Sequence, residues 1–221
     1  MSNKLVRETL AVAQRILTEL LRRRRSLIFW AVFPVLMLVV NSLILQERAQ
    51  LTVAAAYQQA APPTLVGAAL FFSCLGGSVA TVVSEREQQT LKRLFLSPLS
   101  GLSYFLGIFV AHSGIGCLQA FWVWAIAVSV GANFPGSLPL AILVILLSIA
   151  GYVGLGFTFG TQFARRTEDV NALVATFGVP LLLLGGAFLP ISLFPEILLT
   201  LADYNPVYHM IAALEGAING A

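Results

Sequence analysis

The chain has 221 residues, of which 58% are hydrophobic and only 10% are charged, and its mean hydropathy is +0.87. Soluble domains carry about a quarter charged residues, so this composition excludes an ordinary soluble globular protein. The net charge of +3 does not indicate nucleic-acid binding, because the basic residues flank long apolar segments. Cys74 and Cys117 both lie inside apolar runs, and we interpret them as small packing residues rather than as a disulfide or metal site.

The charged residues are separated by long uncharged runs, at residues 26–46, 49–84, 94–164 and 170–195. A helix needs about 20 apolar residues to cross a bilayer, and the alternating pattern of a membrane β-barrel is absent from the sequence. We therefore predict an all-α, polytopic helical membrane protein with five transmembrane helices. The expected spans are residues 26–45, 64–83, 101–130, 137–163 and 170–189.

Residues 3–25, before the first span, are predicted to form an amphipathic helix. A stripe at helical spacing is formed by Val6, Leu10, Ala13, Leu17 and Leu20. Four arginines follow at the end of the segment: Arg22, Arg23, Arg24 and Arg25. The pattern favours a helix lying in the membrane interface with its basic end at anionic headgroups; a plain positive-inside anchor is the alternative. Because the first apolar run begins only after residue 25 and is a full span long, it is expected to stay rather than to be cleaved as a signal peptide.

Residues 84–100, between the second and third spans, hold the one cluster of charges that lies between two long apolar runs. Ser84 followed by Glu87 is typical of a capping box, and Pro98 is expected to stop a helix over 84–97. Leu91 and Leu94 share one face of this helix. The segment is either a docking surface for a partner or an ordinary loop whose charges hold the topology.

The placement of lysines and arginines predicts the orientation of the chain. If the N-terminus is cytoplasmic, every lysine and arginine except Arg48 lies on the cytoplasmic side. The 84–97 helix then faces the cytoplasm, and residues 190–221 face outside. This last segment has no run long enough to cross, so we expect one or two short helices that lie at the interface or dip part-way into the membrane.

The sequence lacks several signatures of chemistry. It contains no phosphate-binding P-loop, no zinc-type cysteine or histidine pattern and no nucleophile elbow. No predicted span contains a charged residue, which argues against an ion-coupled secondary transporter. His112 lies inside the third span, and an intramembrane ionisable residue is a functional candidate; a hydrogen bond between helices is the favoured interpretation.

Residues 84–100 resemble the signature that follows the second span of ABC-2 type permeases, which reads E-R-E-x-x-T-L-x-x-L-x-x-x-P-L-S. The matching positions are Glu85, Arg86, Glu87, Thr90, Leu91, Leu94, Pro98, Leu99 and Ser100. A second stretch is similar to the family's segment after the fifth span. It matches at Gly186, Phe188, Pro190, Pro195, Leu198, Leu201, Asn205, Pro206 and Ala212. The resemblance covers essentially the whole chain as one transmembrane domain.

This resemblance implies the membrane subunit of an ATP-binding-cassette exporter for a drug-like molecule, a lipid or a polysaccharide. Such a subunit is not an enzyme: two separate ATPase subunits bind ATP and Mg²⁺, and a second permease copy or a paralogue completes the pathway in the plasma (inner) membrane. The helix after the second span is the family's coupling helix, so the implied ATPase contacts are Ser84, Glu85, Arg86, Glu87, Thr90, Leu91 and Leu94. A second contact with the ATPase or with headgroups is implied for Arg22–Arg25. The implied extracytoplasmic gate, within a re-entrant segment at 190–212, comprises Phe188, Pro190, Asn205 and Pro206.

The family normally has six spans, whereas no sixth span follows residue 189 here. We interpret this as a truncated sequence, with a genuine five-span protein as the alternative. Two roles are open for the small residues of the second span and the aromatic residues of the third: they line the pathway, or they serve helix packing and interfacial anchoring. The competing function is a non-transporting scaffold that docks a partner through residues 84–100. Charge reversal at Glu85 and Glu87, expected to lower stimulated ATPase activity only in a transporter, would discriminate.

Overall fold

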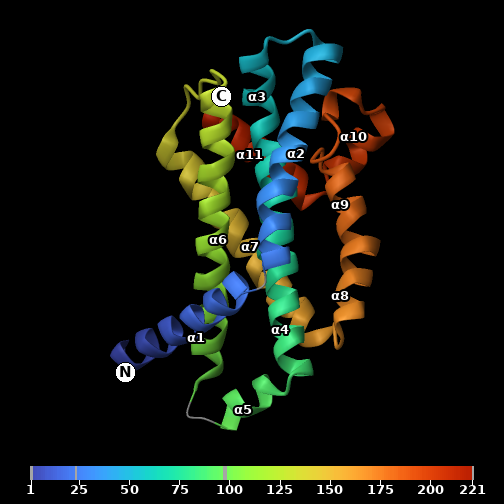
Figure 1. Cartoon of the computed structure of the whole chain (residues 1–221). Coiled ribbons are helices and arrows are strands. Elements are labelled where there is room, and N and C mark those ends of the chain that lie inside the picture. Colours follow the sequence, from blue (N-terminus) through green and yellow to red (C-terminus); the bar gives the residue numbers. More distant parts are fainter. Residues whose placement is uncertain (1, 23, 97–98, 221) are drawn as a thin grey trace.

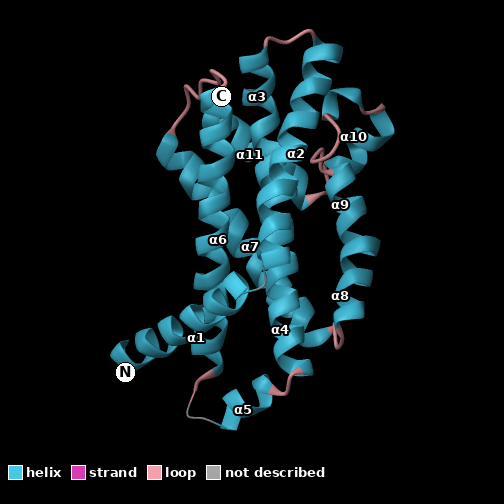
Figure 2. Cartoon of the chain, viewed as in Figure 1, coloured by secondary structure: helices cyan, strands magenta, loops and turns pink. Residues whose placement is uncertain are grey.

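The computed structural model describes residues 2–22, 24–96 and 99–220, so the predictions for Arg23 and Pro98 lie outside it. The described residues form helices joined by short loops (Figures 1 and 2), which confirms the all-α class. Within them, five helices are long and apolar enough to span a membrane, in agreement with the sequence. These helices are Arg24–Ala49, Val53–Glu87, Gly101–Ser129, Leu138–Gln162 and Thr167–Leu184.

The second of these, here called the central helix, is longer than predicted at both ends. It consists of α3 (Val53–Pro63), the π-helical η1 (Thr64–Gly76) and α4 (Gly77–Glu87) without a break. The predicted start of this span at residue 64 is therefore wrong, because the Thr52 hydroxyl accepts a hydrogen bond from the Ala55 N–H and starts a helix there. The two prolines at 62 and 63 remove helix hydrogen bonds, and the wider π-helical turns begin directly after them.

The capping box predicted at Ser84 is also wrong. Ser84 lies inside α4, and the chain leaves the helix only after Glu87. Gln89 then takes the left-handed conformation, with φ 59°, and the separate short helix α5 runs over Thr90–Leu96. The valines at 79, 82 and 83 are buried in the bundle and carry the helix past residue 84. The predicted 84–97 helix is thus divided between the end of a span and α5.

The central helix is the most buried of the five and packs against α2 (Arg24–Ala49), α6 (Gly101–Ser129), α7 (Leu138–Gln162) and α11 (Pro206–Asn219). Small residues make these approaches close, as the sequence predicts. A β-carbon on Gly77 would lie 2.7 Å from the imidazole of His112 on α6. On α7, a β-carbon at Gly156 would overlap Ser78 of the central helix. Each glycine therefore permits a contact that alanine would obstruct.

Helix α1 (Ser2–Arg22) confirms the predicted N-terminal helix and lies across α6 (Figure 1). Its packed face is rotated from the predicted stripe. The buried apolar residues are Val12, Ala13, Ile16 and Leu20, whereas Val6 and Leu10 are about half exposed. The apolar sector is thus wider than the stripe, and one side of it is packed on α6 while the other is free to contact lipid.

Helices α6 and α7 agree with the predicted third and fourth spans to within one or two residues at each end. Ser100 and Ser137 precede them as side-chain N-caps, accepting hydrogen bonds from Ser103 N–H and Leu140 N–H. Cys74 is buried, as interpreted, but Cys117 is exposed on α6, so its predicted packing role is wrong; both are free thiols.

The fifth span is built from α8 (Thr167–Leu173), the π-helical η2 (Val174–Gly178) and α9 (Val179–Leu184). It ends five residues earlier than predicted because Gly185 and Gly186 follow, and Gly186 has φ +79°. Short helices come next, as expected: η3 (Ile191–Leu193), α10 (Glu196–Ala202) and then α11, which extends to Asn219. The turn before α7 is joined to α11 by the Gly136 N–H, which donates to Ile218 O at 2.8 Å.

Candidate functional site

The two ends of the bundle differ in their polar contacts. One end, here called the α5 end, holds α5 and the start of α6, with α1 nearby; the opposite end holds α10 and is called the α10 end (Figure 1). At the α5 end, three consecutive charged residues, Glu85, Arg86 and Glu87, close the central helix. Glu85 contacts α1 and α6, Arg86 contacts the end of α7, and Glu87 contacts the start of α8. Together these contacts fix the point from which α5 projects.

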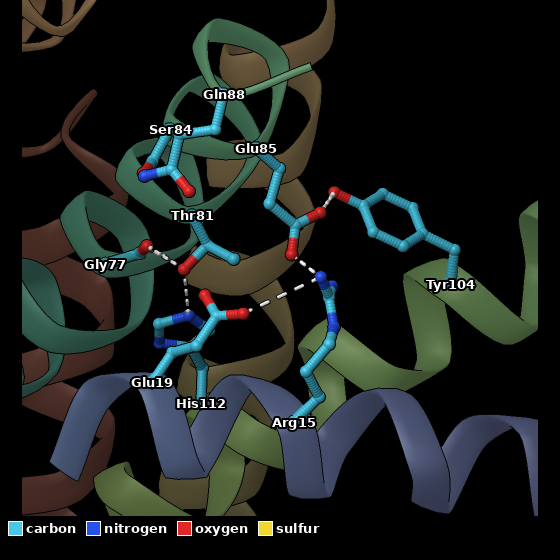
Figure 3. Close-up of polar contacts among 9 residues, drawn as sticks. All are labelled: Arg15, Glu19, Gly77, Thr81, Ser84, Glu85, Gln88, Tyr104 and His112. Atoms are coloured by element: carbon cyan, nitrogen blue, oxygen red, sulfur yellow. Dashed lines mark hydrogen bonds and ion pairs between the residues drawn. The ribbon is translucent and has the colours of Figure 1, made fainter. Parts of the chain in front are cut away.

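Glu85 joins the central helix to α1 and α6 (Figure 3). Its carboxylate forms an ion pair with the guanidinium of Arg15 on α1 and accepts a hydrogen bond of 2.6 Å from the hydroxyl of Tyr104 on α6. Only 3% of Glu85 is exposed. Arg15 also lies 3.7 Å from Glu19 of its own helix. A carboxylate this buried requires such partners, because an unpaired charge in that position would be costly.

Arg86 and Glu87 reach the other side of the bundle. The Arg86 guanidinium donates to the carbonyl oxygens of Ala164, at 2.7 Å, and Thr161, at 3.0 Å, and so satisfies the C-terminal end of α7. The Glu87 carboxylate accepts from the N–H of Thr167 at 3.0 Å and from its hydroxyl at 2.7 Å. Thr167 is the first residue of α8, where negative charge suits the helix dipole. The charged connection between α7 and α8 is thus attached to the central helix.

Helix α5 extends beyond these contacts at the tip of the α5 end (Figure 1). Leu91 and Leu94 are partly buried and pack against the apolar core, whereas Leu96 is 82% exposed. Lys92 and Arg93 are exposed, and within the described residues neither forms an ion pair. The exposed residues of this region, here called the α5 surface, are Gln88, Gln89, Lys92, Arg93 and Leu96.

The structure therefore places the predicted contact residues in two groups. Glu85, Arg86 and Glu87 make contacts within the chain, while Ser84 accepts a hydrogen bond from the Gln88 side chain and Thr90 begins α5. The two basic residues of the α5 surface, Lys92 and Arg93, were given no contact role from the sequence. The sequence did contain a signal that Glu85 is buried. Ser78, Val82 and Glu85 recur at helical spacing, so Glu85 continues the buried face of the span.

Two further contacts concern the N-terminal helix. The Ser103 hydroxyl, at the start of α6, donates to the Glu8 carboxylate at 2.7 Å, and this hydrogen bond lowers the pKa of Glu8. Arg22, Arg24 and Arg25 lie at the junction of α1 and α2, are exposed and form no ion pair with a described residue. Their predicted contact with the ATPase or with headgroups stays a prediction.

The four predicted gate residues all lie in the segment that follows α9. The Asn205 side chain is buried and caps α11, while its amide donates to Leu181 O at 2.7 Å and so connects α11 to α9. Pro206 is the first residue of α11. The ring of Phe188 packs edge-on against Phe33 of α2, and Pro190 precedes η3.

His112 is fully buried and joins helices, which confirms the favoured interpretation from the sequence. Its Nδ1 lies 2.8 Å from Ser73 O, and its Nε2 lies 3.2 Å from the Thr81 hydroxyl (Figure 3). The hydroxyl of the same serine, Ser73, donates to the side-chain oxygen of Gln119, and the Gln119 amide donates to Trp30 O at 2.8 Å. This polar seam connects α2, the central helix and α6 inside the bundle.

Comparison with known proteins accounts for this architecture. The sequence model described as ABC-2 type transporter matches residues 7–218, which is nearly the whole chain. The chain belongs to the ABC-2 type transporter family. Its curated relatives include the "Probable multidrug ABC transporter permease YbhR" of Escherichia coli K12 and its counterpart in Escherichia coli O157:H7. Each is 31% identical over 130 residues, covering 58% of this chain and 35% of the relative. No solved structure matches the chain.

The chain thus spans about a third of the length of the curated ABC-2 relatives that it matches. The family match includes the α5 surface and the contacts of Glu85, Arg86 and Glu87, as well as α1 from residue 7 onward. Family membership and the five apolar helices agree on a multi-pass membrane protein. The resemblance inferred from residues 84–100 and 186–212 is confirmed.

Proposed function

We propose that this chain is the membrane-spanning part of an ATP-driven exporter, acting on an amphiphilic substrate such as a drug-like molecule, a lipid or a polysaccharide. Membership of the ABC-2 type transporter family supports the proposal, as does its similarity to a probable multidrug ABC transporter permease. The chain contains no P-loop, so ATP and Mg²⁺ would be bound by a separate ATPase subunit.

The ATPase would dock on the α5 surface. This surface ends the bundle with two exposed basic side chains, Lys92 and Arg93, beside the exposed Leu96. A site of this kind suits an acidic groove with an apolar floor. Glu85 is buried and Glu87 is bonded to Thr167, so we assign these residues to transmitting the docking force rather than to contacting the ATPase. Arg22, Arg24 and Arg25 would add a second contact with the ATPase or with headgroups.

The contacts of Glu85, Arg86 and Glu87, next to α5, would pass a movement of α5 to other helices. A displacement of α5 acts on the end of α4, and Glu85, Arg86 and Glu87 connect that end to α1, α7 and α8. ATP binding on the partner would therefore tilt several spans together, opening the path from the inner to the outer side. The segment holding Phe188, Pro190, Asn205 and Pro206 would close the outer mouth.

A second permease copy, or a paralogue, would complete the pathway. Two spans are poorly covered by the rest of the described chain. In the most apolar stretch of each, only 22% of the residues of α2 and 17% of those of Thr167–Leu184 are buried. Membrane helices associate by close packing, and these two leave most of their surface for a neighbour or lipid. We place the N-terminus in the cytoplasm and the protein in the plasma (inner) membrane, since the α5 end carries nearly all lysines and arginines.

The observation that carries the proposal is the projecting, basic α5 surface in a chain of this family. It is tested by purifying the tagged protein in mild detergent from its own host and identifying the associated proteins by mass spectrometry. Recovery of a P-loop ATPase at about one copy per permease, with ATP hydrolysis stimulated by the permease, is the expected result. A folded, dimeric protein that repeatedly lacks an ATPase would favour the scaffold function instead.

A further inference from the structure

A cavity of about 110 Å³ lies between α2, α3, η3 and α11 at the α10 end, far from the α5 surface. Its apolar wall includes Leu45 and Ile211. Polar side chains from each of the four elements also line it: Asn41, Gln59, Ser192 and Glu215. Gln59 and Ser192 are exposed, so the cavity opens at this end of the bundle, while Asn41 and Glu215 lie deeper. The proposed coupling mechanism uses none of these four residues.

Asn41 is the most buried of the four, with 3% of its surface exposed. Its amide nitrogen donates to Ala187 O at 3.3 Å, which fixes the orientation of the side chain. The amide oxygen is buried and has no hydrogen-bond partner among the described residues. Buried carbonyl oxygens of this kind nearly always accept a hydrogen bond. Because Asn41 lines the cavity, we infer that a donor bound there satisfies this oxygen.

Glu215 of α11 lines the same cavity and is largely buried. Within the described residues, its carboxylate takes part in no ion pair and no hydrogen bond, and burial raises its pKa. The residues lining the cavity, all of them in the described part of the chain, include no lysine, arginine or histidine. The cavity thus offers a carboxylate and an amide oxygen without a cation of its own.

The size of the cavity limits what it can hold. Pockets that enclose a drug-sized molecule measure about 300–1,000 Å³, so this one accommodates only a head group. An ammonium group is compact and presents three N–H donors and no acceptor. Asn41 Oδ1, the Glu215 carboxylate and the side-chain oxygen of Gln59 or Ser192 are the matching acceptors, and Leu45 and Ile211 offer apolar contact to the attached alkyl chain.

We propose that this cavity binds the ammonium group of an amphiphilic amine, with Glu215 as the counter-ion and Asn41 as the buried hydrogen-bond acceptor. The proposal concerns binding and does not depend on ATPase coupling. Its failure is therefore distinguishable from failure of the proposed function.

The test uses the purified full chain in an uncharged detergent and n-butylammonium chloride as the probe, with binding measured by isothermal titration calorimetry at pH 8. Glu215→Gln keeps the shape of the side chain and is expected to weaken binding at least tenfold. Asn41→Leu removes the buried acceptor oxygen at similar side-chain size and is expected to weaken binding. Glu47→Gln removes an exposed carboxylate on α2, outside the cavity lining, and is the matched control with unchanged affinity.

Two further probes, uncharged n-butanol and sodium chloride, test whether the charge and the alkyl chain of the amine are both needed. n-Butanol has the same alkyl chain without the charge and is expected to bind at least tenfold more weakly, whereas sodium chloride at equal concentration is expected not to displace the amine. Equal affinity of the wild type and Glu215→Gln for butylammonium would overturn the proposal. So would equal binding of butanol, or displacement by sodium, which would indicate an apolar pocket or a metal-cation site. If Glu215→Gln does not fold, Asn41→Leu decides, since unchanged affinity there also contradicts the proposal.

Discussion

Arg15 and Glu85 form an ion pair across 70 residues of sequence and so attach the N-terminal helix to the end of the second span (Figure 3). The pair is asymmetric: 28% of the arginine side chain is exposed but only 4% of the glutamate side chain. Glu85 therefore depends on Arg15 more than the reverse, because water can still solvate the arginine. Tyr104 supplies the other hydrogen bond to the carboxylate. This arrangement makes α1 part of the mechanism at the α5 end rather than a separate anchor.

Replacing Arg15 by leucine is expected to destabilise the protein, because it leaves the Glu85 carboxylate buried without a counter-ion. Breaking one partner of a buried pair typically costs about 3–5 kcal/mol, and the partial exposure of Arg15 places the expected loss toward about 3 kcal/mol. Thermal unfolding of the purified chain, followed by circular dichroism, measures the change. Arg7→Leu, at an exposed position of the same helix, is the control and should unfold close to the wild-type temperature.

A second substitution separates loss of the pair from loss of packing. Glu85→Gln removes the charge and retains a hydrogen-bond acceptor for Tyr104. Adding it to Arg15→Leu is expected to restore part of the lost stability, because no charge then remains buried. A double variant as unstable as the sum of the two single variants would contradict this account of the pair.

The fold was predictable where one property dominates. Long uncharged runs identify spans because hydrocarbon excludes charge, and all five helices were found on that basis alone. The predicted positions of the helix ends were less accurate. The central helix begins at Val53, although residues 53–63 are not hydrophobic enough to suggest a span, since Thr52 caps it and packing against α2 supports it.

The charged contacts at the α5 end were predictable only in part. The cluster at 84–100 stands out, but three successive charged residues on a helix point in different directions. Which of them is buried depends on α1, α7 and α8, which lie far away in the sequence. The family resemblance, applied without these distant elements, therefore assigned Glu85 to an outside partner. The same limit applies to Glu215 and Asn41, which are 174 positions apart and share one cavity only in the folded chain.

Reversing both charges of the α5 surface, in Lys92→Glu with Arg93→Glu, is expected to abolish retention of the ATPase during purification. Both side chains are exposed and make no ion pair among the described residues, so the fold should be unaffected. Arg48→Glu reverses an exposed charge at the α10 end and is the control that retains the ATPase. Full retention by the double variant would remove the α5 surface from the docking site. Charge reversal at Glu85 cannot serve here, because it would also break the pair with Arg15.

The attachment of α1 to α6 is expected to weaken in acid. The hydrogen bond from Ser103 lowers the pKa of Glu8 below its ordinary value of 4.5. A lowered carboxyl pKa contributes stability that is complete above the ordinary value and disappears as pH falls through the folded-state pKa. Ser103→Ala should therefore lower the unfolding temperature at pH 7, and the difference from wild type should narrow as pH drops below 4.5. Ser129→Ala, an exposed serine at the other end of α6, should show a pH-independent difference.

Gly156 provides the strictest test of the helix packing. A β-carbon there would overlap the Ser78 hydroxyl and lie 2.5 Å from the carbonyl oxygen of Leu75, which is backbone and cannot rotate away. Gly156→Ala is therefore expected to push α7 away from the central helix and to cost about 1–3 kcal/mol, as overpacking does. Gly154→Ala is the matched control two residues earlier, where a β-carbon meets open space and alanine raises helix propensity. We expect thermal unfolding to show a lower transition for Gly156→Ala and an unchanged or higher one for Gly154→Ala. Equal transitions would mean that α7 does not approach the central helix as closely as described.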